Sequence, residues 1–135
     1  LDIYINLAAY QPEAFRPLLA VVLNGYGILL TKKGDLINAE KKYYEALQIR
    51  RQLASLNPKV YLPSVGTTAL NLSLLYIQNI PNQDKSLSYL KEAIVALLPF
   101  YETLPRAQDD LNTCFEVLDS WGIDPQGFLQ NLADE

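Results

Sequence analysis

The stretch from Pro17 to Leu56, PLLAVVLNGYGILLTKKGDLINAEKKYYEALQIRRQLASL, predicts two helices joined by a short break. Apolar side chains recur in both parts at three- and four-residue steps, the spacing that places them on one face of a helix. We expect the first helix to run from about Pro17 to Thr31, because proline is tolerated in a first helical turn. We expect the second to span about Leu36 to Leu56, between the break at Gly34 and the Asn57-Pro58 pair.

This two-helix unit occurs twice. Residues 1–30 align with residues 47–76 without a gap, an offset of 46, and the shared positions are mostly apolar. Two pairs of prolines also coincide, Pro12 with Pro58 and Pro17 with Pro63. A gapless match of this kind indicates a repeated supersecondary unit. The second copy therefore predicts a helix from about Pro63 to Ile77 and another from Asp84 to Leu98, separated by a break at Asn79–Asn82.

Small, apolar and aromatic residues hold fixed places in the two copies. The first copy has Leu23, Tyr26, Gly27, Leu30, Gly34, Ala39, Tyr43 and Ala46, and the second has Ala69, Leu72, Ser73, Tyr76, Ser86, Leu90 and Ala93. This pattern resembles the tetratricopeptide-repeat (TPR) family, with one extra residue in the loop around Ile80-Pro81. Ser73 and Ser86 stand where the family has Gly and Ala. The period is longer than the usual ~34 residues, and in this it is similar to the extended repeats of some large bacterial arrays.

The resemblance implies an all-α fold, with antiparallel helical hairpins stacked as a right-handed TPR-like α-solenoid and a C-terminal capping helix. Residues 1–13 are expected to be the end of the second helix of a truncated preceding repeat. Residues 14–60 and 61–104 would form repeats 1 and 2, and 105–135 the capping helix and tail. A helical apolar stripe within 105–135 predicts the capping helix, through Leu111, Cys114, Phe115 and Leu118. Because the stretch from Leu118 to Ile123 echoes Leu23 to Ile28, we expect this helix to continue until Asp124-Pro125 stops it.

The composition argues against a nucleic-acid binder. The 135 residues carry a formal net charge of −4, whereas proteins that track a phosphate backbone are basic. Six of the eleven basic residues fall between Lys32 and Arg51, and we interpret them, including Arg50, as a solvated exterior. The longest uninterrupted apolar runs, such as Ala93 to Phe100, fall short of the ~18 residues of a membrane span. We therefore expect no nucleic acid and no membrane among the partners.

The side chains that carry most enzyme chemistry are missing. The chain has no histidine, the commonest acid–base group and metal ligand, and it has one cysteine. That cysteine, Cys114, is expected to be a buried structural thiol, because it lies on an apolar stripe and has no histidine base. It cannot form an internal disulfide, so nothing indicates an oxidising compartment. We expect a cytoplasmic protein that is not an enzyme and holds no cofactor or metal.

Function is therefore expected to come from the surface. The resemblance implies a concave groove, lined by first helices, that binds a peptide or partner helix, so that the chain acts as a protein–protein interaction scaffold. The groove positions carried over from the family are Val21, Asn24, Ile28, Thr31, Lys32, Thr67, Leu70, Leu74, Ile77, Gln78, Glu116 and Asp119. Their mainly apolar character favours an amphipathic or apolar partner. Only Asn71 stands at a position of the family's chaperone-tail clamp and Gly25 fills another, which disfavours that ligand.

Two further hypotheses stay open beside the peptide-binding scaffold. One is structural self-assembly through the exposed faces of terminal repeats, which would give a weak homodimer through the N-terminal edge. The other is a sensor or regulatory arm of a larger regulator or enzyme, whose catalytic part lies outside this sequence.

The N-terminal edge gives a first prediction. Residues 1–12 match the end of a second helix, 47–58, and Ile5 stands where the later copy has Arg51, so this edge carries extra apolar surface. Changing Ile3 and Ile5 to Lys is expected to shift any oligomer toward monomer, as measured by sedimentation, with helicity nearly unchanged. An unmodified chain that stays monomeric at high concentration would contradict the self-assembly hypothesis.

Overall fold

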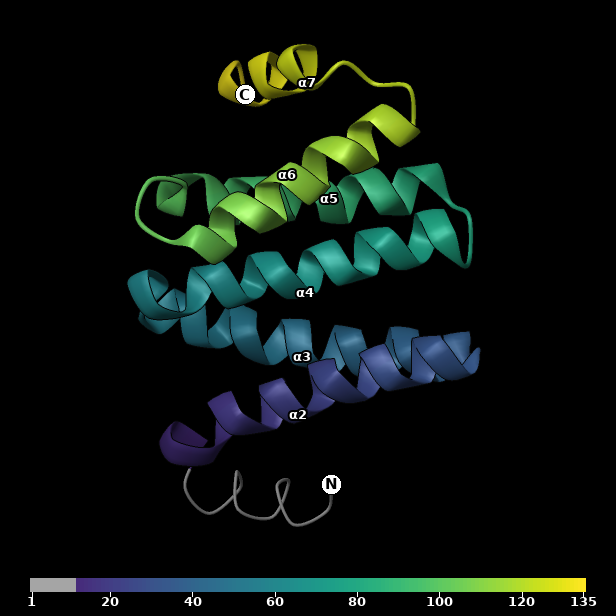
Figure 1. Ribbon diagram of the computed structural model, residues 1–135. Helices are drawn as coiled ribbons and strands as arrows, with labels where there is room; N and C mark the ends of the chain where they lie inside the picture. The colour runs from purple at the N-terminus through teal and green to yellow at the C-terminus, as the bar shows by residue number, and fades with distance from the viewer. Residues whose placement is uncertain (1–11) are drawn as a thin grey trace.

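The computed structural model describes residues 12–135, which contain α-helices and no strand (Figure 1). The helices are α2 (Pro12–Lys33), α3 (Leu36–Leu56), α4 (Pro58–Gln78), α5 (Gln83–Leu97), α6 (Pro105–Ser120) and α7 (Pro125–Ala133), with the 3-10 turn η1 (Leu98–Phe100). The predicted all-α fold is confirmed. Residues 1–11, with the expected truncated repeat and homodimer edge, lie outside the described residues.

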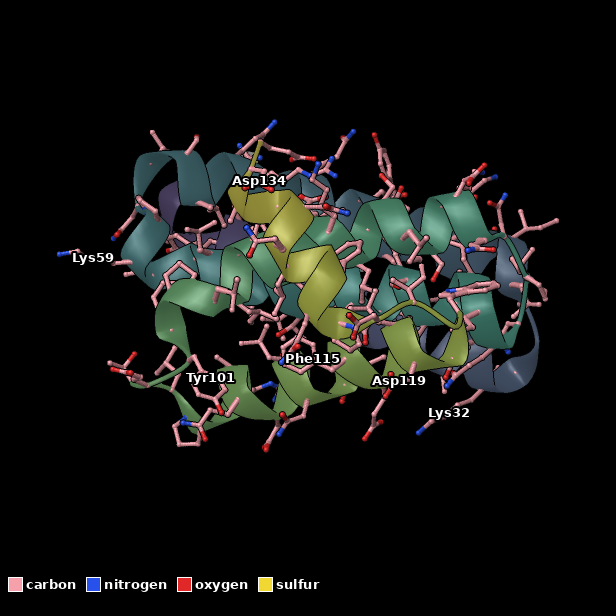
Figure 2. The ribbon with its side chains drawn as sticks, turned by 90° about the horizontal axis from the view of Figure 1, so that it is seen from above. Lys32, Lys59, Tyr101, Phe115, Asp119 and Asp134 are labelled. Atoms are coloured by element: carbon pink, nitrogen blue, oxygen red, sulfur yellow. The ribbon has the colours of Figure 1, made fainter. Side chains whose placement is uncertain are left out.

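The helices stack in sequence order. Successive helices from α2 to α6 run in opposite directions and are joined by short connections, which leaves each helix beside its neighbour in the chain. The near side in Figure 1 is formed by α2, α4 and α6, and α3 and α5 lie behind them. Figure 2, seen from above, shows α7 lying across the end of the stack. The helices α2, α4 and α6 therefore form one face of the stack, and α3 and α5 form the opposite face.

The first helix of each hairpin begins earlier than the sequence predicts. Pro17 and Pro63, expected in the first helical turn, lie inside α2 and α4. Pro58 takes the first turn of α4 after Asn57, where its missing N–H needs no partner. Pro63 then frees only the carbonyl four residues back, on Lys59, whose side chain is exposed near the start of the helix. In α2, as in α4, a proline that was expected in the first turn therefore lies within the helix.

The C-terminal segment also differs from expectation. The helix α6 ends at Ser120 and does not continue to Asp124, because Gly122 adopts a left-handed φ of 75° and the Ile123 amide donates to the Leu118 carbonyl at 2.9 Å. The expected tail is itself a helix, α7. The side chain of Asp124 caps it by accepting from the Gly127 amide at 3.1 Å, with Pro125 in the first turn. Asp124-Pro125 is thus the start of one helix, two residues beyond the break that ends another.

Close helix contacts occur at small residues, as the repeat pattern predicts. Ala46 is fully buried, and a Cβ placed on Gly27 would lie 2.6 Å from Cδ1 of the Tyr43 ring. In the second hairpin, a Cβ on Gly66 would lie 2.4 Å from Leu97 Cγ. Interiors are packed to crystal-like density, so these helices approach only because a side chain is absent. By contrast Tyr26, at an aromatic motif position, is exposed.

Ser73 and Ser86 bond to one another across α4 and α5. The Ser73 hydroxyl lies 2.8 Å from the Ser86 carbonyl oxygen, and the Ser86 hydroxyl donates to the Ser73 carbonyl at 3.0 Å. Both serines are fully buried. The indole N–H of Trp121, just after α6, donates to the Ser86 hydroxyl at 2.9 Å. These buried serines therefore join α4 and α5 to the residue that follows α6, with each buried hydroxyl satisfied.

Two described helices are long and apolar enough to cross a membrane, judged by length and composition. They are Ala14–Lys33 and Pro58–Gln78, with mean hydropathy 1.4 and 1.3 over their best windows. Counting uninterrupted apolar runs in the sequence missed them, because single polar residues divide each one. The window in α4 is half buried inside the molecule, and a core helix of a soluble protein passes the same test. These helices are therefore weak evidence for a membrane.

The close contact at Gly27 predicts that the same substitution at two glycines of α2 changes the free energy of unfolding in opposite directions. Gly27→Ala is expected to lower the free energy of unfolding by about 1–3 kcal/mol, because the new Cβ meets the Tyr43 ring. Gly25→Ala, with nothing within 4 Å of its Cβ, is expected to raise it by about 0.5–1 kcal/mol, since alanine favours a helix. Urea unfolding of both variants measures the pair. Equal effects would show that α2 and α3 do not meet at Gly27.

Candidate functional site

The predicted groove residues gather on the face formed by α2, α4 and α6, which carries three hollows. The largest, of about 560 Å³, lies between all three helices and includes Val21, Asn24 and Thr67. The other two, each of about 260 Å³, lie between α2 and α4 and between α4 and α6. They are lined by the remaining predicted residues Ile28, Thr31, Lys32, Leu74, Ile77, Gln78 and Glu116. The fold thus brings ten residues predicted from three separate helices onto one surface.

Two predicted residues are not part of these hollows. Leu70 is only 4% exposed and belongs to the same buried cluster as Leu111 and Val117 of α6. The prediction placed it on the surface because the register of α4 alone does not reveal which other helices pack around it. Asp119 is exposed near the end of α6 and lines none of the three hollows. Leu70 is therefore a core residue, and Asp119 lies beside the face.

The sequence analysis missed Arg50, Arg106 and Asp110, which also line this face. Arg50 comes from α3, behind the face, yet lines the hollow of about 560 Å³, here called the Arg50 pocket. The side chain is 8% exposed, which corrects its interpretation as part of a solvated exterior. The helical spacing indicated that Arg50 is buried. The steps from Tyr43 to Leu47, to Arg50 and to Ala54 are four, three and four residues, which places all four on one buried face of α3.

A chain of hydrogen bonds fixes Arg50 in the pocket wall. Its Nη1 donates to the Thr68 hydroxyl at 2.5 Å and to the Ser64 carbonyl at 3.3 Å. The Thr68 hydroxyl in turn donates to Oδ1 of Asn24 at 3.1 Å, and Nδ2 of Asn71 donates to the same oxygen at 3.1 Å. These bonds connect α3, α4 and α2. The guanidinium is therefore held in one orientation by three helices.

Two charged residues of α6 complete the same pocket. The side chain of Arg106 is 77% exposed, and its Nε lies 4.0 Å from Oδ2 of Asp110. Asp110, 16% exposed, also accepts a hydrogen bond from the Thr67 hydroxyl at 2.8 Å. Burial, and secondarily the positive charge of Arg106, lower the pKa of Arg50. The pocket therefore holds two positive groups and one negative group.

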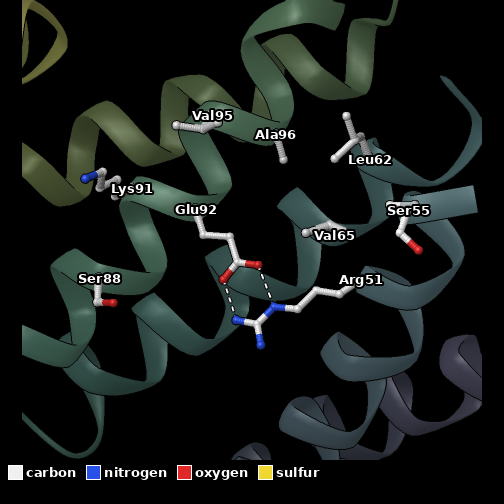
Figure 3. Close-up of a pocket in the computed structure, with 10 residues that line it drawn as sticks. Arg51, Ser55, Leu62, Val65, Ser88, Lys91, Glu92, Val95 and Ala96 are labelled. Atoms are coloured by element: carbon white, nitrogen blue, oxygen red, sulfur yellow. Dashed lines mark hydrogen bonds and ion pairs between the residues drawn. The ribbon is translucent and has the colours of Figure 1, made fainter. Parts of the chain in front are cut away.

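The opposite face has a hollow of its own, of about 610 Å³, between α3 and α5 (Figure 3). Arg51 and Glu92 face one another there in a two-pronged ion pair, with Nε···Oε2 at 2.7 Å and Nη2···Oε1 at 2.6 Å. Hydrogen bonding to Glu92 raises the pKa of Arg51. Adjacent arginines of α3 thus point to opposite faces, and only Arg51 has a described carboxylate partner.

The described residues offer little for catalysis or metal binding. Within 12–135 no group of three His, Cys, Asp or Glu side chains could hold a metal ion. Cys114 is completely buried, as predicted, and burial, with a smaller contribution from Asp110, raises its pKa to about 12. A thiol that stays protonated at neutral pH is a poor nucleophile. The chemistry available on the α2–α4–α6 face is recognition through apolar contact, hydrogen bonds and charge.

No protein-family model matches this chain, and no match was found among curated proteins or solved structures. What the α2–α4–α6 face can bind therefore has to follow from its own residues.

Cys114 gives a pH-dependent test. In the folded protein its reaction with iodoacetamide is expected to be far slower than in urea-unfolded protein from about pH 7 to 10, because a pKa near 12 leaves little thiolate. Because the pKa of Cys114 is raised from its ordinary value of 9.0, the buried thiol contributes to the free energy of unfolding. This contribution is fully present below pH 9 and is lost as the pH rises through about 12. Equal alkylation rates in the folded and unfolded protein would show that the thiol is accessible.

Proposed function

We propose that this protein is a protein–protein interaction scaffold that binds a peptide or partner helix along its α2–α4–α6 face. The carrying observation is the row of three hollows on that face, lined by residues from successive first helices of the hairpins. Exposed apolar side chains such as Val21 and Ile28 lie among hydrogen-bonding groups such as Asn24. Apolar contact with a few fixed polar groups is the usual composition of a peptide groove.

We also propose that the hairpins are repeats of the TPR type. The stacking of α2–α3 and α4–α5 in sequence order supports this. So does the burial of small residues at matching places, such as Ala46 in one hairpin and Ala93 in the next. In repeat proteins of this class each unit packs only on its neighbours, which leaves long surfaces free for a partner.

The proposed setting of the scaffold is the cytoplasm, and bacterial arrays are the proposed relatives. The cytoplasm is favoured because the chain's single cysteine cannot form an internal disulfide. A binding role without catalysis also stays a proposal. It is supported by the absence of histidine from the sequence and by the burial of Cys114.

A selection from a random twelve-residue peptide library displayed on phage tests this function. Two valines with nearly equal exposure provide a matched pair of variants: Val21 on the α2–α4–α6 face, 55% exposed, and Val95 on the α3–α5 face, 56% exposed. Val21→Gln is expected to weaken selected peptides about tenfold, because burying a valine contributes roughly 1.5 kcal/mol. Val95→Gln should leave binding unchanged.

Fluorescence anisotropy with labelled peptides measures both variants. Loss of binding in Val95→Gln but not in Val21→Gln would move the binding site to the α3–α5 hollow. Failure to enrich any peptide, with the protein shown to be folded by circular dichroism, would contradict the proposed function.

A further inference from the structure

The Arg50 guanidinium is buried, positively charged and only partly hydrogen-bonded. Arginine carries five N–H donors in a fixed planar arrangement and stays protonated in proteins. In Arg50, Nη1 bonds to Thr68 and Ser64, whereas Nε and Nη2 bond to no residue in the described part of the chain. No acidic side chain described in residues 12–135 lies within ion-pair distance of it. The unused donors belong to a residue that lines an open pocket.

A buried charge without a counter-ion is costly, because burial removes the water that would otherwise stabilise it. Proteins commonly offset this cost with a carboxylate. On the opposite face even the more exposed Arg51 has such a partner, Glu92. The side chain of Arg50 is instead held in place by neutral partners, Thr68 and the Ser64 carbonyl. No fully buried side-chain nitrogen or oxygen of the described residues lacks a hydrogen-bond partner, so the unused donors of Arg50 are open to solvent. Because Thr68 and Ser64 fix the guanidinium, these donors are preorganised for an acceptor that arrives with a ligand.

The charge of the pocket favours a singly charged anion. Arg50 and Arg106 are positive and Asp110 is negative, so the three side chains leave one net positive charge. A phosphate group, which is close to doubly charged at neutral pH, would meet the Asp110 carboxylate without a matching third cation. A carboxylate carries one charge and accepts two parallel N–H bonds from a guanidinium.

We propose that the Arg50 pocket receives the carboxylate of an aspartate or glutamate side chain from the bound peptide. This inference rests on the proposed function, since it names the group that the α2–α4–α6 face selects in its partner. The planar Nε and Nη2 donors of Arg50 bind the carboxylate, and Arg106 at the exposed edge attracts it. Val21 and Leu104, which also line the pocket, contact the apolar part of the same side chain or its neighbours. The partner is thus an amphipathic segment with an acidic residue at one fixed position.

The test uses peptides without a free C-terminal carboxylate, so that only side chains can supply the anion. Twelve-residue peptides displayed as N-terminal fusions are selected on the unmodified chain, and the best one is synthesised with a C-terminal amide. Aspartate or glutamate is expected to be enriched at one position. Replacing that residue by its amide is expected to weaken binding about tenfold or more, measured by fluorescence anisotropy.

Variants of the protein locate the effect. Arg50→Gln is expected to reduce the preference for the acidic peptide over its amide analogue from tenfold or more to about threefold or less, because only Arg106 then favours the charge. Arg51→Gln, the same change one residue later on the opposite face, should discriminate like the unmodified chain. Arg106→Gln should weaken the acidic peptide about threefold and the amide analogue little, as expected for an exposed charge. If Arg50→Gln does not fold, the Arg106→Gln variant and the two peptides on the unmodified chain still decide the question.

The possible failures can be told apart. If selected peptides depend on Val21 but bind equally as acid and amide, the carboxylate inference is overturned and the proposed function stands. If no peptide is enriched, both are overturned. If phosphoserine in place of the acidic residue binds more than tenfold tighter, the pocket is a site for doubly charged anions, which also overturns the inference.

Discussion

The close approach of neighbouring helices at positions without large side chains is the constraint on which this structure depends. Gly27 lets α2 lie against the Tyr43 ring of α3, and Gly66 does the same for α4 against Leu97. Where a small residue carries a hydroxyl, as at Ser73 and Ser86, the hydroxyl bonds across the contact. These contacts set how closely the two helices of each hairpin pack, and so where the first helix of each hairpin lies relative to the second. A larger residue at Gly27 or Gly66 would push α2 away from α3, or α4 away from α5, and so displace a helix of the binding face.

Much of the fold could be predicted from the sequence, because helical spacing and break residues are local signals. The bounds of α3 were predicted to the residue by Gly34 on one side and Asn57-Pro58 on the other. The predicted start of α4 was wrong, because both Pro58 and Pro63 suit a first helical turn by local rules. The structure shows that the helix begins at Pro58. Asp124-Pro125 was interpreted as a stop, although an Asp followed by Pro is equally a capped start. Within the two predicted repeats, local rules therefore predicted how many helices there are more accurately than where each helix begins and ends.

The candidate site was predictable only where one helix determines exposure. The resemblance to tetratricopeptide repeats supplied Val21, Asn24 and Ile28 as groove positions of the first helix, and these residues do line the hollows. Leu70 was misplaced because its burial depends on packing with other helices of the core cluster, which its own helix does not reveal. Arg50 was missed because a basic residue is exposed in most proteins, so that composition outweighed a spacing that pointed inward. A single sequence does not readily reveal burial that depends on distant helices, as at Leu70, or the burial of a charged side chain, as at Arg50.

The bond between Trp121 and Ser86 has a consequence for how the stack comes apart. In a linear array each hairpin is held mainly by its neighbours, so unfolding can begin at one end and leave the other intact. Trp121 is the chain's single tryptophan and lies at the junction of α5 with the turn before α7. Its fluorescence therefore reports on that end of the array, whereas far-ultraviolet circular dichroism averages over every helix. If the circular dichroism signal falls before the Trp121 fluorescence changes, unfolding starts at the α2 end. The single tryptophan therefore reports the direction in which the stack unfolds.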